Sequence, residues 1–269
     1  MKQKIVIKLG GSSLENPATL KELAQLIEGY QKKFDVVLVH GGGPAINQEL
    51  LARGIEWKFI NGQRQTTPEM MGVIDEVLAT KVNGRIVETL KDAGLSVVGL
   101  SGARDQILFC KHADPELMQV GAITHVNTDK IEDCLAQLKP AIPVVAPIGI
   151  SENGEEKFNI NADWAATQIA IALQAKKLIF LTDQNGILGE KQKLLRTATP
   201  VIIHKMIDDG IISGGMRTKV LAMISALDAG VRHVHVLNAS VASHVLSQTK
   251  MGTLLKNSKP KGELHERAS

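Results

Sequence analysis

The sequence has 269 residues, of which 44% are hydrophobic, 22% are charged and only 3% are aromatic. This length suits one large α/β domain or two lobes, and the composition predicts an aliphatic core in an ordinary globular protein. A net charge of +3, with no dense Lys/Arg stripe interleaved with aromatic residues, argues against a nucleic-acid partner.

The cysteines and the N-terminus indicate the compartment. Cys110 and Cys134 are too few and too far apart for a disulfide framework or a CxxC metal site, and they fit reduced thiols in cytosol. The N-terminus has strand character instead of a targeting segment, and no apolar run is long enough to cross a membrane. We therefore expect a cytoplasmic protein with no membrane partner.

Apolar strand candidates recur along the chain, and helical patterns lie between several of them. The candidate strands cover residues 4–9, 35–40, 95–100, 141–148, 176–182 and 233–237. Strands that alternate with helices need crossover connections, which favour parallel pairing. The sequence therefore predicts a single α/β domain, a three-layer sandwich with a largely parallel central sheet.

The first strand ends in a candidate anion site. It carries Lys8 near its end and opens into Gly10-Gly11, and a helix is predicted from Pro17 with Asn16 as its N-cap. Ligands of parallel sheets gather at the carboxyl ends of the strands, where glycine amides and helix starts favour phosphate. The same residues also fit a strand-end lysine that reaches water.

The second strand runs into a triglycine, Gly41-Gly42-Gly43, with Pro44 at the expected first helical position. This predicts a second anion cradle. A His-Gly-Gly-Gly stretch also supplies oxyanion-hole amides in α/β-hydrolases. That class needs a G-x-S-x-G turn, and the nearest candidate, residues 99–103, lacks the last glycine. A hydrolase is therefore a distant alternative.

A polar loop follows at residues 61–67, and Arg64 is its one strong anion ligand. A guanidinium can hold a carboxylate through two parallel hydrogen bonds, although a solvated loop charge fits as well. A long helical pattern, capped by Thr67, then runs from Pro68 to about Ala93. Its length makes it a candidate subunit contact, and a helix that is kinked or split near Gly84 fits equally.

The second half of the chain contains further polar positions at predicted element ends. Residues 103–126 are weakly patterned and could form a hairpin over the end of the sheet. Asn161 and Asp163 fit the start of a helix to Ala175, where capping explains both. Capping does not explain Asn159, whose amide can bind a polar ligand.

Asp183 follows a further strand, where it could orient a ribose or a metal or form a local turn. Lys219 lies about one turn into a helix that begins near Ser213 and runs to Ala229. A lysine on a helix is usually only solvated.

The sequence lacks two common nucleotide-binding motifs but resembles a known family. The sequence has no GxxxxGK[ST], which excludes a P-loop kinase, and no GxGxxG after a strand. Instead, five motifs in matching order resemble the amino-acid kinase family over residues 4 to about 255. They are Lys8-Leu9-Gly10-Gly11, His40-Gly41-Gly42-Gly43-Pro44, Asn61-Gly62-Gln63-Arg64, Asn159-Ile160-Asn161-Ala162-Asp163 and Gly215-Met216-Arg217-Thr218-Lys219.

The resemblance implies ATP-dependent phosphorylation of a side-chain carboxylate. The Asn-Gly-x-Arg loop with Asn-x-Asn-Ala-Asp points to the members that act on N-acetyl-L-glutamate in arginine biosynthesis. Mg²⁺ is expected on the phosphates, although no protein ligand for a metal can be recognised. The amino acid would bind an N-terminal lobe, about 1–172, that also makes the dimer contact. The nucleotide would bind a C-terminal lobe, about 173–256, and the polar tail 257–269 is predicted to be disordered.

The resemblance also implies roles for individual residues. Lys8 and Lys219 would stabilise the transferring phosphoryl group, and Asp163 would position these two lysines. Arg64 and Asn159 would hold the amino acid, with the amides of Gly42 and Gly43 near its reacting end. The nucleotide site would be lined by Gly10, Gly11, Asp183, Gly186, Ser213 and Met216.

Some positions depart from the family pattern and leave alternatives open. A lysine is usual where Ala103 or Arg104 stands before Asp105, and small residues are usual at Gln106 and Trp164. Acyl preference could shift here, so a kinase of N-succinylglutamate or of an aminoadipate-type compound is an alternative. A non-catalytic amino-acid sensor is a distant one.

Members of the family that arginine inhibits carry an extra N-terminal helix, whereas here the first strand starts after roughly three residues. We therefore expect a homodimer without arginine feedback.

Overall fold

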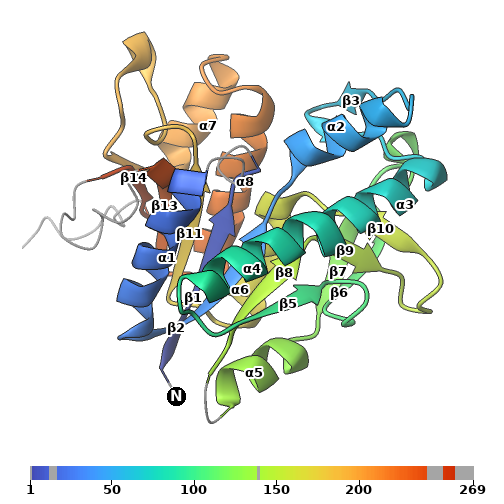
Figure 1. Cartoon of the computed structure of the whole chain (residues 1–269). Coiled ribbons are helices and arrows are strands. Elements are labelled where there is room, and N and C mark those ends of the chain that lie inside the picture. The colour runs from blue at the N-terminus through green and yellow to red at the C-terminus, as the bar shows by residue number, and fades with distance from the viewer. Residues whose placement is uncertain (1, 12–16, 138–139, 241–250, 258–269) are drawn as a thin grey trace, which may run out of the picture.

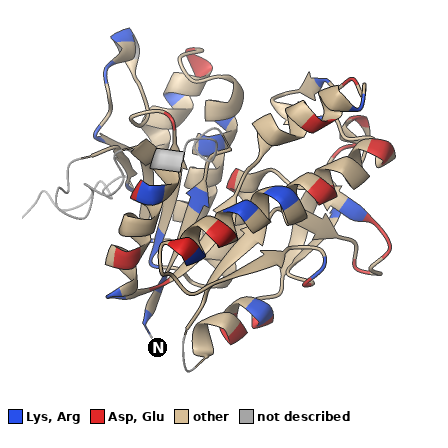
Figure 2. Ribbon diagram, in the orientation of Figure 1, with Lys and Arg blue, Asp and Glu red and all other residues tan. Residues whose placement is uncertain are grey.

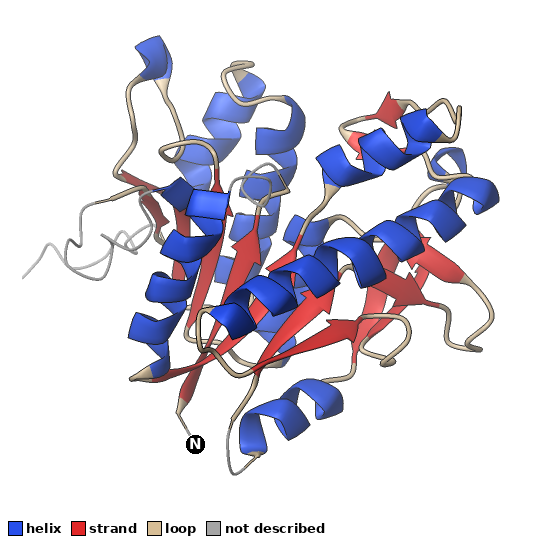
Figure 3. Cartoon of the chain, viewed as in Figure 1, coloured by secondary structure: helices blue, strands red, loops and turns tan. Residues whose placement is uncertain are grey.

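The computed structural model of the chain describes residues 2–11, 17–137, 140–240 and 251–257. Its centre is an eight-stranded sheet with the strand order β12-β14-β13-β11-β1-β2-β8-β5 (Figures 1 and 3). All neighbouring strands of this sheet run parallel except β13 and β14, which are antiparallel. The predicted, largely parallel central sheet is therefore confirmed.

The strands of the main sheet include all six strands that the sequence predicts. Their bounds are β1 Gln3–Leu9, β2 Phe34–His40, β5 Val97–Ser101, β8 Ile142–Ala146, β11 Lys177–Thr182, β12 Thr197–Ala198, β13 His233–Asn238 and β14 Thr253–Leu255.

Helices cover both faces of the sheet, as expected for three layers. The helices are α1 Pro17–Gln31, α2 Gly43–Ala52, α3 Pro68–Glu76, η2 Val77–Val82, α4 Asn83–Asp92, α5 Asp129–Ala136, α6 Ala162–Ala172, α7 Pro200–Asp208 and α8 Gly214–Asp228, with short 3-10 turns η3 Pro115–Leu117 and η4 Glu190–Gln192. On one face, α1 and α4 pack against Ile5, Ile7 and Leu9 of β1. On the other, α5, α6 and α8 pack against Val6 of β1 and Phe180 of β11.

A smaller sheet extends the N-terminal half beyond the end of the main sheet. It has the order β10-β9-β6-β7, with β6 Leu108–His112, β7 Gly121–Val126, β9 Ile148–Ile150 and β10 Lys157–Asn159. Its β6 and β7 are antiparallel, so the predicted hairpin within residues 103–126 is confirmed. A separate two-stranded hairpin joins β3 Phe59–Ile60 to β4 Gln63–Arg64.

The predicted long helix is present, but with an irregular middle. Residues 68–92 are helical throughout, and the turns of η2 are π-helical, so the irregularity lies ahead of Gly84. Thr67 caps α3, because its side chain accepts a hydrogen bond from the amide of Met70. The predicted N-cap Asn16 and the predicted disordered tail, apart from Asn257, lie outside the described residues. No helix in the described residues is both long enough and apolar enough to cross a membrane.

Candidate active site

Strand alternation places Lys8 beneath two helices. Successive side chains of β1 point to opposite faces of the sheet. Ile5, Ile7 and Leu9 therefore face α1, while Val6 and Lys8 face α6 and α8. Lys8 is only 8% exposed, which rules out a lysine that simply reaches water.

Three charged side chains from three elements meet at this point. Lys8 Nζ lies 2.8 Å from Asp163 Oδ1 in the first turn of α6. Lys219 Nζ, from the second turn of α8, lies 3.0 Å from both carboxylate oxygens of Asp163. Lys219 also stands 5.4 Å from the ring centre of Phe180. Asp163 and Lys219 are as buried as Lys8, so the trio forms one compact charge cluster.

The cluster carries a net positive charge in a poorly hydrated place. Burial alone would raise the pKa of Asp163, but the charges and hydrogen bonds of the two lysines outweigh burial and lower it. Burial, and then the charge of Lys8, lower the pKa of Lys219 to about 8, although Asp163 opposes this shift. Two buried ammonium groups that share one carboxylate leave one positive charge for an anion.

The two glycine turns pack backbone against backbone beside the cluster. The Gly41 amide donates to Leu9 O at 2.9 Å, which joins the second turn to the end of β1. A Cβ atom at Gly11 would lie 3.1 Å from the amide nitrogens of both Gly42 and Gly43. Glycine allows this close approach, because a Cβ atom here would make the two turns move apart by a few tenths of an ångström. The amides at the start of α2 thus lie next to the first turn.

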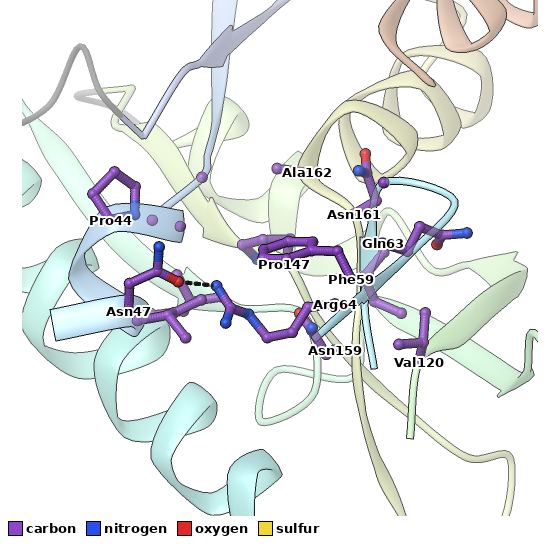
Figure 4. A pocket seen from close by; sticks show the side chains of 17 residues that line it. Pro44, Asn47, Phe59, Gln63, Arg64, Val120, Pro147, Asn159, Asn161 and Ala162 are labelled. Atoms are coloured by element: carbon purple, nitrogen blue, oxygen red, sulfur yellow. Dashed lines mark hydrogen bonds between the residues drawn. The ribbon is translucent and has the colours of Figure 1, made fainter. Parts of the chain in front are cut away.

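A pocket of about 340 Å³ opens from the second glycine turn and receives side chains from several elements (Figure 4). Its lining includes Gly41, Gly42, Gly43, Asn47, Phe59, Gln63, Arg64, Val120, Pro147, Asn159 and Asn161. This volume is at the small end of the range for small-molecule sites. All four residues predicted to bind the amino acid, Gly42, Gly43, Arg64 and Asn159, line this one pocket.

Arg64 is held in the pocket with part of its guanidinium unsatisfied. The side chain is 7% exposed, donates from Nη2 to Asn47 Oδ1, and lies 4.9 Å from the ring centre of Phe59 and 5.5 Å from that of Trp57. Burial lowers the pKa of Arg64 to about 10, so the group stays charged at neutral pH. Among the buried side-chain atoms that the structure describes, Arg64 Nη1 is the one without a hydrogen-bond partner. A bound carboxylate would supply that partner.

Asn159 closes the far side of the pocket. Its Nδ2 atom donates to Thr66 Oγ1 at 3.0 Å, and this hydroxyl donates to the carbonyl of Arg64. An amide nitrogen carries two hydrogens, so Asn159 can still donate to a ligand. Asn161 caps α6 as predicted, accepting from the amides of Asp163 and Trp164, and it also lines the pocket.

The positions predicted to line a nucleotide site follow the ends of β1 and β11 or lie at the start of α8. The Gly10 amide donates to Leu181 O at 2.9 Å, and Asp183 comes two residues later. Ser213 precedes the first residue of α8, and Met216 in its first turn packs against the main core. Gly186 has φ 140°, and a Cβ there would lie 2.7 Å from Leu194 and Thr253, so packing alone requires glycine. Their part in nucleotide binding stays a prediction.

Sequence reasoning overlooked several residues that build the pocket. Asn47, Trp57 and Phe59 hold the Arg64 side chain, yet no motif singled them out. One sequence signal could have found Phe59. The Asn61-Gly62 pair is typical of a hairpin turn, and such a turn brings Phe59 directly opposite Arg64. The sequence also did not predict the contact between His40 and Asn83. The Nδ2 atom of Asn83 lies 3.1 Å from the Nε2 atom of His40.

The fold and the charge cluster define a kinase of the amino-acid type. The sequence matches the model of the amino acid kinase family over residues 3–238, and the chain belongs to this family. The curated relatives that it resembles are acetylglutamate kinases. It is 37% identical to that of Paracoccus denitrificans over 96% of this chain and 86% of the relative. It is 38% identical to that of a Geobacillus species over 96% of this chain and 98% of the relative.

Two solved structures share the fold of this chain. The smu.665 protein of Streptococcus mutans superposes with a TM-score of 0.81 at 31% identity, over 95% of this chain and 99% of that chain. A carbamate kinase from Giardia superposes with a TM-score of 0.66 at 15% identity, over 95% and 99% of the two chains. The latter likeness shows the shared fold alone.

Proposed function

We propose that this chain transfers the γ-phosphoryl group of ATP to the side-chain carboxylate of N-acetyl-L-glutamate, forming N-acetyl-L-glutamyl 5-phosphate for arginine biosynthesis. The observation that carries the proposal is the meeting of Lys8 and Lys219 on Asp163, next to the two glycine turns. Membership in the family makes the chain a kinase, and its similarity to acetylglutamate kinases supports the acceptor.

The proposed phosphoryl transfer needs no general base from the cluster of Lys8, Asp163 and Lys219. A carboxylate is already ionised at neutral pH, so the nucleophile needs no proton removed. The reaction is opposed by repulsion between the carboxylate and the triphosphate. Lys8 and Lys219 would offset that charge in the transition state, while Asp163 holds both ammonium groups in place. Alignment of the carboxylate with the γ-phosphoryl group would lower the activation free energy further.

The pocket supplies the acceptor side. Arg64, with its unpartnered Nη1, and Asn159 would bind the α-carboxylate end of the amino acid. The side-chain carboxylate would then point to the amides of Gly42 and Gly43, at the amino end of α2. The acceptor would then bind the N-terminal lobe, about 1–172.

The nucleotide would lie across the C-terminal lobe, about 173–256. Gly10, Gly11, Asp183, Gly186, Ser213 and Met216 would line its site, with phosphates directed to Lys8 and Lys219. In the described residues no group of three or more His, Cys, Asp or Glu side chains could hold a metal ion. We propose that Mg²⁺ comes bound to the phosphates.

A second cavity favours testing a longer acyl group as well. It holds about 310 Å³, shares Gln63, Ile160 and Asn161 with the first pocket, and is also lined by Trp164. A substrate such as N-succinylglutamate could extend into it, whereas an acetyl group has no need of the space.

A coupled assay of ADP release tests the acceptor directly. We expect N-acetylglutamate to give the highest kcat/KM among N-acetylglutamate, N-succinylglutamate, glutamate, aspartate, carbamate and uridylate. Faster turnover of N-succinylglutamate would move the assignment to a longer acyl group. ADP release that no acceptor stimulates would contradict the proposal.

Arg64→Ala tests how the acceptor is bound. It should raise the KM for N-acetylglutamate and leave the KM for ATP near its original value, because Arg64 faces only the acceptor pocket. Arg53→Ala, in an exposed cluster with Glu49 and Glu76, is the matched control and should change neither constant. A selective loss of ATP affinity in Arg64→Ala would overturn the assignment.

A further inference from the structure

His40 is the last residue of β2 and leads directly into the second glycine turn. It is fully buried and faces α4. Its Nδ1 atom lies 2.9 Å from the carbonyl oxygen of Gly41, and its Nε2 atom lies 3.1 Å from Asn83 Nδ2. A carbonyl can only accept and an amide nitrogen can only donate. The ring must therefore carry its proton on Nδ1 and accept at Nε2.

The ring is neutral in this environment. Burial lowers the pKa of His40 to about 4, against the hydrogen bond to Gly41, and the charge of Lys8 adds to the lowering. His40 does not line the acceptor pocket, so it has no place as a general base. Its two hydrogen bonds, one to the turn and one to Asn83, are its visible contribution.

Asn83 ties this ring to the neighbouring strands. Its Nδ2 atom also lies 2.8 Å from Val144 O of β8 and 3.4 Å from Leu100 O of β5. The fit is tight, because a Cβ at Gly99 of β5 would lie 2.2 Å from Asn83 Oδ1. One buried amide nitrogen of α4 thus lies within 3.4 Å of acceptors on three parallel strands, which share its two hydrogens.

The π-helical turns of η2 bring a second residue onto the same glycine turn. Asn83 follows η2 directly, and Leu78 within η2 packs so closely on Gly42 that a Cβ there would lie 2.4 Å from Leu78 Cδ2. Such wide turns inside helices occur often at functional sites. Leu78 therefore packs against Gly42, while His40 is hydrogen-bonded to the carbonyl of Gly41.

We propose that His40 and Asn83 are positioning residues that fix the Gly41–Gly43 turn, and with it the two amides at the reacting end of the acceptor. This inference rests on the proposed function, because it takes the Gly42 and Gly43 amides to contact the side-chain carboxylate. The pair touches no substrate and acts through the turn.

Two substitutions of His40 separate this role from simple packing. An asparagine places its amide near the position of Nδ1 and can still donate to Gly41 O, whereas a glutamine reaches only toward Asn83. We expect kcat to fall by about a hundredfold in His40→Gln but by less than about tenfold in His40→Asn, since misplaced groups lose alignment. The KM for ATP should be unchanged, and both variants should lose similar thermal stability. Equal losses of kcat, or an unchanged kcat in His40→Gln, would overturn the inference.

A pair of glycine substitutions gives a test that leaves His40 intact. Gly99→Ala would push the Asn83 amide aside and should lower kcat by about tenfold through the same turn. Gly84→Ala, next to Asn83 on the exposed side of α4, has nothing within 4 Å of its new Cβ and should leave kcat unchanged. An unchanged kcat in a folded Gly99→Ala variant would contradict the inference.

A measurement without turnover distinguishes failure of this inference from failure of the proposed function. In ¹⁵N spectra of the wild-type protein, His40 should carry its proton on Nδ1 and should not titrate between about pH 5 and 8, because its pKa lies near 4. A proton on Nε2 would overturn the inference whatever the enzyme phosphorylates. A wild-type protein that phosphorylates no acyl-amino acid would overturn the proposed function, and a proton on Nδ1 would then still support the part of the inference in which His40 holds the glycine turn.

Discussion

At the scale of single residues, the site depends on two lysines that cannot both be neutralised by their one shared carboxylate. Lys8 and Lys219 each lie within 3.0 Å of Asp163 and are shielded from water. A buried positive charge is unfavourable without a partner. An incoming phosphoryl group would supply that partner, which makes the cluster suited to bind charge that develops during transfer.

Lys8→Arg should lower kcat by about tenfold or more, because a planar fork replaces a compact ammonium group that contacts Asp163. Lys4→Arg is the matched control. Lys4 lies on the same strand and pairs with Glu132 at 2.5 Å, away from the site, so its replacement should leave kcat unchanged. Steady-state kinetics on the purified variants would show the difference, and full activity in Lys8→Arg would remove Lys8 from catalysis.

The pKa of Lys219, about 8, predicts an alkaline limit to activity. The ammonium form is the active one, so raising the pH through that value removes the charge. We expect kcat/KM to fall by about tenfold per pH unit above it, since this constant reports the free enzyme. The alkaline decrease in kcat should begin at a higher pH than the decrease in kcat/KM, because bound phosphates favour the ammonium form of Lys219.

Lys219→Arg provides the control for this pH profile. A guanidinium does not titrate in the range, so the variant should be slower but flat across it. A wild-type kcat/KM that stays constant to about pH 9.5 would contradict an alkaline limit set by Lys219 near pH 8.

At the scale of elements, helix starts and strand ends deliver the charged groups. The helix α6 begins where Asn161 caps the amides of Asp163 and Trp164, so the cap also fixes the carboxylate that holds both lysines. Figure 2 shows that acidic and basic residues are mixed along the outer side of the α3–α4 helix. Within this helix, Glu76 and Lys81 form an ion pair with each other, Glu76 also pairs with Arg53, and Lys81 also pairs with Glu49 of α2.

Asn161→Ala should lower the free energy of unfolding by about 1 kcal/mol through loss of the cap, and should also lower kcat. Thr199→Ala removes the cap of α7, far from Asp163 in the chain, and should reduce stability without changing kcat. Urea denaturation and kinetics on the same preparations would compare them. Asn161→Ser should be nearly as stable as the wild type, because serine also caps helices well. A normal kcat in Asn161→Ala would show that the cap does not help to position Asp163.

Much of this arrangement could be predicted from local pattern. The apolar run before Lys8 predicts a buried strand, and the caps at Thr67 and Asn161 follow from residue type and spacing. The π-helical turns could not be foreseen, because they shift the apolar spacing by too little to distinguish from a regular helix. Asn83 sits among the buried apolar positions of that helix, which was an unused signal.

Contacts between distant segments required a different source. No spacing rule brings residue 219 to residue 8, and the meeting at Asp163 was expected only from the resemblance to a family. Likewise, the contacts of the Arg64 guanidinium with the rings of Trp57 and Phe59 depend on how the hairpin folds over the pocket. Long-range packing of this kind is set by the whole core and not by neighbouring residues.

At the scale of the whole molecule, residues between 41 and 162 line the pocket of Arg64, and we propose that the nucleotide lies mainly across residues 173–256. We propose that two copies associate through the helix of residues 68–92, which extends past the main sheet (Figure 1). Gel filtration with light scattering should give twice the 29.0 kDa of the chain. Thr80→Arg, at an exposed position of this helix, should shift the mass toward the monomer. A hexamer in the wild type would contradict this assembly.

The defining step of the proposed reaction is transfer of a phosphoryl group to a carboxylate, and trapping with hydroxylamine measures that step. Incubated with ATP, Mg²⁺ and N-acetylglutamate, the protein should form about one hydroxamate per ADP, because the acyl phosphate reacts with hydroxylamine. N-acetylglutamine, which lacks the side-chain carboxylate, should form none. ADP release without hydroxamate, or hydroxamate formed equally well by a protein that lacks both Lys8 and Lys219, would contradict the account.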